Sequence, residues 1–504
     1  MACGGMKSLG LAGALAVLAL SCTSAAADTC ADLASAKLHN AQVMAATNVP
    51  AGQFTTPDQI GYGSLTFDVP AFCRVELTIG TATAEVWLPA AWNNRLSGWG
   101  NGGELGAIIY QGLYWGVWGG YVSVSSDLGH QSYGGNASWA FNRPDLVEEF
   151  GYTSTHDMTV AAKKLAKLYY GEAVSYSYFL GGSAGGRQAL MEAQRYPHDY
   201  NGIGSLYPAQ GWTHIMAGMI SQELKLGGSA NSEGQLSDDQ ALSLNAAVVE
   251  KCDKLDGLRD GLIEDPTQCH FDPAVMACSS KHHPTTCFTD AQVTATRALY
   301  QPLTLSSGKV VYAGLPYGSE FEWSCSVLHD AFNLPFANSW FQNEVYTPSW
   351  DFHTFDPDVD VPNADAAQAD TLNAWSPNLD AFRYGGGKLI IGQGQSDAIV
   401  VPENTVDYYR KLKRRNGNAT EFFARLYMLP GAGHCGPAQG PSSWDVFGAL
   451  VPWVEHGIAP KSIVATQYNN DGSVKRTRPL CPWPQQARYN GQGDVDDWRS
   501  FTCK

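Results

Sequence analysis

The sequence of 504 residues has little charge, and positive charge is the scarcer kind. Charged residues make up 16% of the chain, against about 25% in an average soluble domain, which excludes long disordered tracts and charged coiled coils. The 32 Lys and Arg residues stand against 48 Asp and Glu residues, for a net charge of −16 at pH 7. Because nucleic-acid binding depends on a positively charged surface, we expect no nucleic acid among the partners.

Long hydrophobic runs are also lacking beyond the N-terminus. A membrane-spanning helix needs about 20 apolar residues, and no uninterrupted run of that length occurs, so we expect no integral membrane segment. The apolar run Leu9–Leu20 follows Lys7 and precedes Ala25–Ala27, which is the pattern of a secretory signal peptide. We therefore expect residues 1–27 to be removed and the protein to be secreted or periplasmic. Lipoprotein anchoring at Cys22 is the alternative.

The spacing of the cysteines argues against a structural zinc site. No two cysteines form a Cys-x-x-Cys pair, and the 12 histidines are scattered along the chain. Ten of the 12 cysteines remain after the expected signal peptide. In an oxidising compartment such cysteines form disulfide bonds by default.

The order of the predicted elements indicates an α/β fold. Short β-branched and aromatic runs are predicted to be strands, and residues 156–170 carry apolar side chains at helical spacing before Gly171. The strands are expected at 84–88, 121–126, 175–180, 388–391 and 423–428. Alternation of strand and helix predicts a mainly parallel sheet.

Residues 209–377 break this alternation. The segment is rich in Asn, Asp, Ser and Pro and holds five of the ten cysteines. We interpret it as a lid domain inserted into the core, over the strand ends that would carry the active site. Residues 28–208 are then the first part of the core, and residues 378–504 are the second part.

A nucleophile elbow is predicted where the strand 175–180 ends. The strand leads into Gly181-Gly182-Ser183-Ala184-Gly185-Gly186, and a helical pattern follows. Gly-x-Ser-x-Gly between a strand and a helix is typical of serine hydrolases, although the motif alone also occurs in glycine-rich turns. Ser183 is therefore the candidate nucleophile.

Two later strands are followed by the other residues that such a nucleophile needs. Asp397 comes after strand 388–391, and His434 comes after strand 423–428. The order Ser, Asp, His is that of the α/β-hydrolases. Ser183 would attack the substrate, His434 would move the proton, and Asp397 would orient the imidazole. The alternatives without a catalytic role are that Asp397 only forms a turn and that His434 is an ordinary loop histidine.

An oxyanion hole needs two backbone N–H groups. One is expected at Ala184, directly after the nucleophile, and the other at Gly102 in the glycine-rich loop 99–103. An ordinary glycine loop is the alternative for Gly102.

An acidic loop at 252–265 suits calcium. The carboxylates of Asp253, Asp256 and Asp260 and the carbonyls of Leu258 and Leu262 would supply oxygen ligands. The spacing is not that of an EF-hand. An acidic surface turn is the alternative.

These segments together resemble the tannase/feruloyl esterase family over nearly the whole mature chain. The markers are the sequence around Ser183, Cys-Asp-Lys-Leu-Asp-Gly-Leu-Arg-Asp-Gly at 252–261, Gly-Gln-Ser-Asp at 394–397, Pro-Gly-Ala-Gly-His-Cys at 430–435 and Arg-Pro-Leu-Cys-Pro-Trp-Pro at 478–484. The resemblance implies an α/β-hydrolase fold and a lid that holds a structural Ca²⁺. It also implies hydrolysis of small esters of aromatic carboxylic acids, either free or attached to plant polysaccharide or tannin. It further implies the disulfides Cys30–Cys73, Cys252–Cys269, Cys278–Cys287 and Cys481–Cys503.

One position departs from the family pattern. The family usually has a cysteine directly before the nucleophile, bridged to the cysteine directly after the catalytic histidine, and here these positions are Gly182 and Cys435. We expect Cys435 to be a free thiol, with a bridge to Cys325 as the alternative. We also expect the variant Gly182→Cys to form the bridge to Cys435.

The sequence is compatible with several classes of substrate. No arginine occurs in the lid segment 326–345 where a carboxylate clamp could lie, which favours neutral feruloyl or galloyl esters. The alternatives are a mono(2-hydroxyethyl) terephthalate-type hydrolase, a secreted serine peptidase and a binding protein with a decayed site of the same fold.

Overall fold

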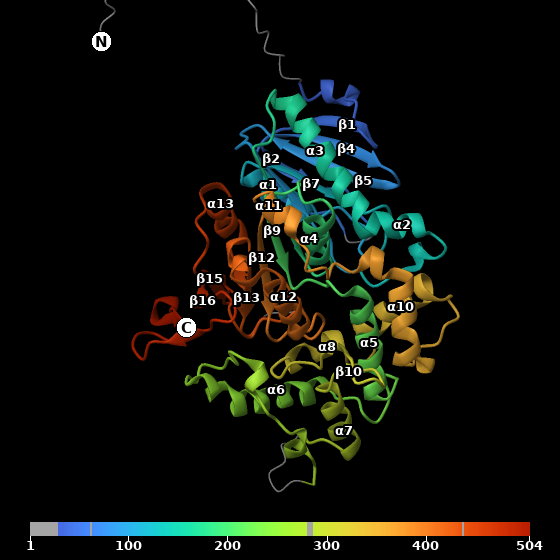
Figure 1. Ribbon diagram of the computed structural model, residues 1–504, viewed down its shortest axis with the longest axis vertical. Coiled ribbons are helices and arrows are strands. Elements are labelled where there is room, and N and C mark those ends of the chain that lie inside the picture. Colours follow the sequence, from blue (N-terminus) through green and yellow to red (C-terminus); the bar gives the residue numbers. More distant parts are fainter. Residues whose placement is uncertain (1–28, 61–62, 280–285, 436–437) are drawn as a thin grey trace, which may run out of the picture.

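The computed structural model describes residues 29–504 apart from 61–62, 280–285 and 436–437 (Figure 1). The expected signal peptide, residues 1–27, lies outside the described residues. Within the described part of the chain, no helix is long and apolar enough to cross a membrane.

A nine-stranded sheet forms the centre of the core. Its order is β1-β4-β5-β7-β6-β8-β9-β12-β13. The bounds are β1 Ala41–Val49, β4 Phe72–Ile79, β5 Ala82–Pro89, β7 Val122–Ser126, β6 Arg95–Trp99, β8 Tyr176–Gly182, β9 Gly202–Leu206, β12 Lys388–Gly394 and β13 Ala424–Leu429. All five strands predicted from the sequence are present, and the α/β fold class is confirmed.

The sheet is mixed rather than mainly parallel along its whole width. From β7 to β13 every neighbouring pair is parallel, whereas β1, β4, β5 and β7 pair antiparallel. The short link between β4 and β5 explains the difference, because two strands joined by a tight turn can only pair antiparallel. The parallel half carries the three candidate catalytic residues at its carboxyl edge.

Helices cover both faces of this sheet, as the buried residues of each helix show. On one face the core includes residues of α3, α4, α11 and α12, and on the other it includes residues of α1 and α13. The bounds are α1 Tyr110–Trp118, α3 Ser154–Tyr170, α4 Ala184–Arg195, α11 Asp380–Tyr384, α12 Pro402–Asn416 and α13 Val446–His456. Helix α3 ends as predicted, because Gly171 adopts φ 75°, a left-handed conformation that favours glycine.

In Figure 1 the helices between β9 and α11 lie below the sheet and to its right, with α10 at about the height of β13. They are α5 Trp212–Leu226, α6 Asp238–Cys252, α7 Asp290–Leu299, α8 Trp323–Ser326, α9 Asn333–Trp340 and α10 Pro357–Leu372. Capping boxes at Ser237 and Thr289 start α6 and α7. A large apolar core joins these helices to the sheet edge, since it includes Ala184 and residues 398–401. We refer to residues 209–377 as the lid.

Small elements complete the chain. A short helix, α2 Pro144–Glu148, precedes α3, and β2 Gly52–Thr55 pairs with β3 Thr66–Val69. A hairpin in the lid is made of β10 Leu303–Thr304 and β11 Val310–Tyr312. Near the C-terminus lie β14 Ser443–Trp444, β15 Ile463–Tyr468, β16 Val474–Leu480, β17 Ala487–Tyr489 and β18 Phe501–Cys503.

Five disulfides join the ten cysteines. Four are the pairs expected from the family resemblance, namely Cys30–Cys73, Cys252–Cys269, Cys278–Cys287 and Cys481–Cys503. The fifth joins Cys325 to Cys435. The expectation that Cys435 is a free thiol is therefore wrong. Helix α8 of the lid carries Cys325 and lies against the loop that carries Cys435, so the two cysteines lie within bonding distance although 110 positions separate them.

Candidate active site

Ser183 occupies a strained turn between β8 and α4. Its backbone has φ 58° and ψ −120°, which is rare for a residue with a side chain. This conformation is possible because the strand and the helix fix both flanks of the turn. The result is that Ser183 projects from the carboxyl edge of the sheet, as the nucleophile-elbow interpretation requires.

The structure brings the three predicted catalytic side chains into one hydrogen-bonded chain. His434 Nε2 lies 3.1 Å from Ser183 Oγ, and His434 Nδ1 lies 2.9 Å from Asp397 Oδ2. Asp397 is fully buried. Its other oxygen accepts hydrogen bonds from the amides of Ile399 at 2.9 Å and Val400 at 2.7 Å, which fix the carboxylate.

The charge around His434 favours its protonated form. Burial by itself would lower the pKa of His434, but the carboxylates of Asp397 and Glu322 outweigh it and raise the pKa above the usual value. The side chain keeps 13% of its surface exposed, so a substrate can reach it. An imidazole in this setting can take a proton from Ser183 and be stabilised as the cation.

The two expected oxyanion donors lie on adjacent segments. Ala184 is the first residue of α4, where no preceding helical turn accepts its N–H. The loop with Gly102 is held against α4, because the amide of Asn101 donates to Gln188 Oε1 at 3.0 Å. Asn101 Nδ2 donates to the carbonyls of Ala107 and Ser126 and so fixes the loop from inside. This placement suits a pair of convergent amides.

Gly182, directly before Ser183, lies against Tyr207. A Cβ at this position would lie 2.5 Å from the Tyr207 hydroxyl and 2.6 Å from its ring. Cys435 is bonded to Cys325 and has no free valence. The expected bridge from Gly182→Cys to Cys435 is therefore wrong for this chain.

The acidic loop of the lid is closed by its own hydrogen bonds. Asp253 accepts from the amides of Asp260 and Gly261 at 3.2 and 3.1 Å, and Asp256 accepts from the amide of Leu258 at 2.9 Å. Asp260 also forms an ion pair with the buried Arg478. Among the described residues, no group of three His, Cys, Asp or Glu side chains converges closely enough to hold a metal ion as placed.

Sequence reasoning missed Glu322, a buried lid carboxylate beside the histidine. It belongs to a short turn inside the irregular insertion, where no periodic pattern marks it. One feature of the sequence could have pointed to it. Cys325 lies three positions later, and if its disulfide with Cys435 had been predicted, Glu322 would have been expected close to His434.

Comparison with known proteins identifies the family of this chain. The family model described as tannase and feruloyl esterase matches residues 80–504. An uncharacterized esterase of Xanthomonas campestris pv. campestris is 34% identical, over 97% of this chain and 93% of that protein. A probable feruloyl esterase B-2 of Aspergillus flavus is 33% identical, over 79% of this chain and 80% of that protein.

Solved structures give the same fold. The crystal structure of feruloyl esterase B from Aspergillus oryzae superposes with a TM-score of 0.87 at 28% identity, covering 94% of this chain and 99% of that one. The tannin acyl hydrolase from Aspergillus niger, at 20% identity and a TM-score of 0.76, shares the fold over 93% of this chain and 92% of that one. The α/β-hydrolase fold is thus confirmed. The chain belongs to the tannase and feruloyl esterase family and is a carboxylic ester hydrolase.

Proposed function

We propose that this protein is a secreted serine esterase that hydrolyses esters of aromatic carboxylic acids, of feruloyl or galloyl type, through an acyl-enzyme. The observation that carries the proposal is the chain of hydrogen bonds from Ser183 through His434 to the buried Asp397. A binding protein with a decayed site would be under no constraint to keep all three side chains in this geometry.

Acylation follows from the positions of the three side chains. Ser183 Oγ attacks the ester carbonyl while His434 Nε2, 3.1 Å away, accepts the hydroxyl proton. Asp397 holds the imidazole through Nδ1 and stabilises the cation that forms. The imidazolium then gives its proton to the departing alcohol, and the acyl group stays on Ser183.

Deacylation repeats these steps with water as the nucleophile. His434 takes a proton from the water, and the free acid leaves as the proton returns to Ser183. In both halves of the reaction the amides of Ala184 and Gly102 would bind the carbonyl oxygen as negative charge develops on it. Removing one such donor in other enzymes costs a factor of roughly 100 to 1,000 in kcat.

The substrate class and the compartment rest on two further observations. Relatives that match most of this chain are named probable feruloyl esterase B-1 and B-2. The five disulfides suit an oxidising compartment. A mono(2-hydroxyethyl) terephthalate-type hydrolase would carry a cation for the free carboxylate of its substrate. Arg187 could not serve, because it is fully buried and donates to the carbonyls of Gly151 and Phe150.

A panel of esters tests the proposal. Purified protein is assayed with methyl ferulate, methyl gallate and mono(2-hydroxyethyl) terephthalate, with p-nitrophenyl butyrate as a general ester. We expect one of the first two to have the highest kcat/KM. A preference for the terephthalate monoester would show that the protein is an esterase but that the proposed substrate class is wrong. Absence of turnover on all four would favour the binding-protein alternative.

We further propose that the lid binds Ca²⁺ through Asp253, Asp256 and Asp260 and the carbonyls of Leu258 and Leu262. The donor chemistry fits, because calcium prefers carboxylate and carbonyl oxygens, and these five positions lie in one short loop. Several of these carboxylates accept amide hydrogens in the structure. The cation would replace some of those bonds and would stabilise the loop; it has no part in the steps above.

A further inference from the structure

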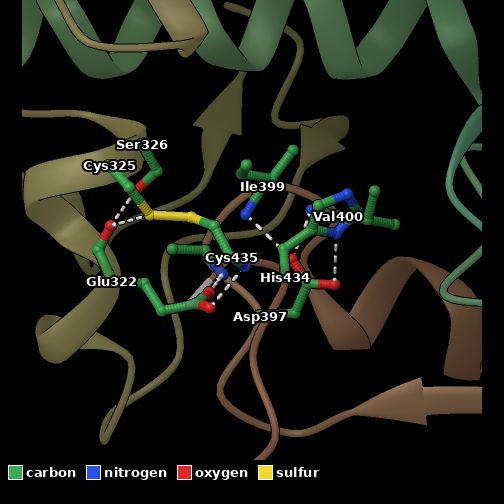
Figure 2. Close-up of a disulfide and its surroundings, with 9 residues drawn as sticks. Glu322, Cys325, Ser326, Asp397, Ile399, Val400, His434 and Cys435 are labelled. Carbon is green, nitrogen blue, oxygen red and sulfur yellow. Dashed lines mark hydrogen bonds and ion pairs between the residues drawn. A yellow bond between two sulfur atoms is a disulfide. The ribbon is translucent and has the colours of Figure 1, made fainter. Parts of the chain in front are cut away.

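Glu322 lies at the junction of the lid and the catalytic loops. It ends the turn Glu320–Glu322 and immediately precedes α8, and only 1% of its surface is exposed. Figure 2 shows its side chain pointing from the lid toward the backbone beside His434 and Cys435. A carboxylate buried this deeply is costly unless hydrogen bonds compensate.

The two carboxylate oxygens of Glu322 bind two different loops. One oxygen accepts from the amide of Cys435 at 2.7 Å, and the other accepts from the amide of Ala398 at 3.3 Å. These amides belong to the residues that directly follow His434 and Asp397. One lid side chain thus joins the loop that carries the histidine to the loop that carries the acid.

The histidine loop is shaped for this contact. A Cβ at Gly433, directly before His434, would overlap the carboxylate of Glu322. Glycine at this position lets the carboxylate reach the amide of Cys435. A side chain that only filled space in the lid core would not need so close an approach to the backbone of the histidine loop.

The lid holds Glu322 in place from behind. The hydroxyl of Ser326 donates to the Glu322 carbonyl at 2.8 Å, and the Glu322 amide donates to the carbonyl of Ser319. The disulfide Cys325–Cys435 joins α8, which follows this turn directly, to the histidine loop (Figure 2). These contacts hold Glu322 in one position relative to the loop that carries His434.

Three ionisable side chains surround His434. Asp397 approaches from the loop after β12, Glu322 from the lid, and the ring of Tyr207 after β9 lies 5.0 Å from the imidazole between ring centroids. Both carboxylates raise the pKa of His434. Burial and the nearby Asp397 raise the pKa of Glu322 to about 7, while the amides it binds work in the opposite direction. Tyr207 stays neutral, because burial and Asp397 raise its pKa.

We infer that Glu322 is a positioning residue: it holds the loops of Asp397 and His434 in register and, when ionised, supplies a second negative charge beside the imidazole. This inference rests on the proposed catalytic role of His434. It assigns to the lid a part in the chemistry of the site in addition to covering it.

The matched pair Glu322→Gln and Glu320→Gln tests the inference. Glu320 is an equally buried carboxylate on the same turn, but its oxygens accept from Asn245, Tyr300 and the amide of Gly318 and not from the amides that follow His434 and Asp397. Glutamine keeps the size of the side chain, removes its charge and turns one of the two acceptor oxygens into a donor. We expect Glu322→Gln to lower kcat at least tenfold and to move the acid limb of kcat/KM down by about one pH unit. Glu320→Gln should change thermal stability and leave the pH profile in place.

A titration that needs no turnover separates this inference from the proposed function. Histidine-labelled protein carrying Ser183→Ala is titrated by NMR with and without Glu322→Gln, and His434→Asn assigns the signal. We expect the midpoint of His434 to fall when Glu322 loses its charge, and Glu322→Asp, which keeps the charge, to reverse part of the fall. An unchanged midpoint in the folded Glu322→Gln protein overturns the inference. Esterase activity retained by Ser183→Ala would instead overturn the proposed function.

Discussion

Cys325 in the lid is bonded to Cys435, the residue after His434, with their Cα atoms 6.7 Å apart. In the family pattern the cysteine after the histidine bonds to the neighbour of the nucleophile, a position that is Gly182 here. Here the disulfide ties the histidine loop to the lid and not to the nucleophile turn. Because of this bond, the lid supports the loop that carries His434, the proposed catalytic histidine.

Removing this bond should destabilise the protein more than it slows the reaction. Cys325→Ser opens a loop of 110 residues, which the chain-entropy model values at about 4–5 kcal/mol, an upper figure. We expect a clearly lower Tm and, well below it, most of the wild-type kcat, because the hydrogen bonds of Glu322 remain. Thiol titration of the denatured proteins supplies the control. One thiol is expected in the variant and none in the mature wild type, and a reactive Cys435 in the wild type would show the pairing to be incorrect.

Adding a side chain at Gly182 should harm the enzyme. Gly182→Ala or Gly182→Cys would press against Tyr207, and overpacking of this kind costs about 1–3 kcal/mol. Because Ser183 is the next residue, we expect kcat to fall together with Tm. Gly211→Ala is the matched control, since its Cβ would meet only Trp375 at an ordinary distance of 3.5 Å. A Gly182→Cys variant that is more stable than wild type and shows a 182–435 cross-link would contradict this account.

The pH dependence of hydrolysis should follow the ionisation of His434. The imidazole accepts the proton of Ser183 only when it is neutral, so kcat/KM should fall as the pH drops through the pKa of His434. The carboxylates of Asp397 and Glu322 raise that pKa against the effect of burial, so the midpoint of the fall should lie above the ordinary 6.5. Asp397→Asn should move the midpoint down and lower kcat. A wild-type midpoint below 6.5 would argue against the electrostatics described here.

Calcium should stabilise the lid with little effect on chemistry. Binding to the folded loop adds to the free energy of unfolding by mass action, so EDTA or Asp256→Ala should lower Tm. Asp238→Ala, which removes an exposed acidic residue at the start of α6, serves as a control for the loss of charge. Equal melting curves with EDTA and with added calcium, and no metal by elemental analysis, would refute the site.

The sequence predicts the catalytic edge of the sheet well and the lid poorly. Ser183, Asp397 and His434 each follow a strand with a clear apolar pattern, and parallel strands bring their carboxyl ends together whatever lies between them. Glu322 and Cys325 belong to a segment without periodicity, so their positions depend on how the lid docks. Strands β1, β4, β6 and β9 are not among the strands predicted from the sequence. The pattern of β1 is irregular, with Met44 on its exposed side. In β4 the signal was present, because apolar residues at 73, 75, 77 and 79 alternate with polar ones.

Ser183 is proposed to be the nucleophile of an aromatic-acid esterase. The most direct measurement is the release of ferulate from methyl ferulate, followed by chromatography. Purified wild type and Ser183→Ala are compared at equal concentration, after both have been shown to have the same Tm. The account predicts steady release by the wild type. It predicts a fall in kcat of about 10,000-fold or more in the variant, because members of a triad act as a unit. Release by Ser183→Ala at more than about a tenth of the wild-type rate would contradict the claim.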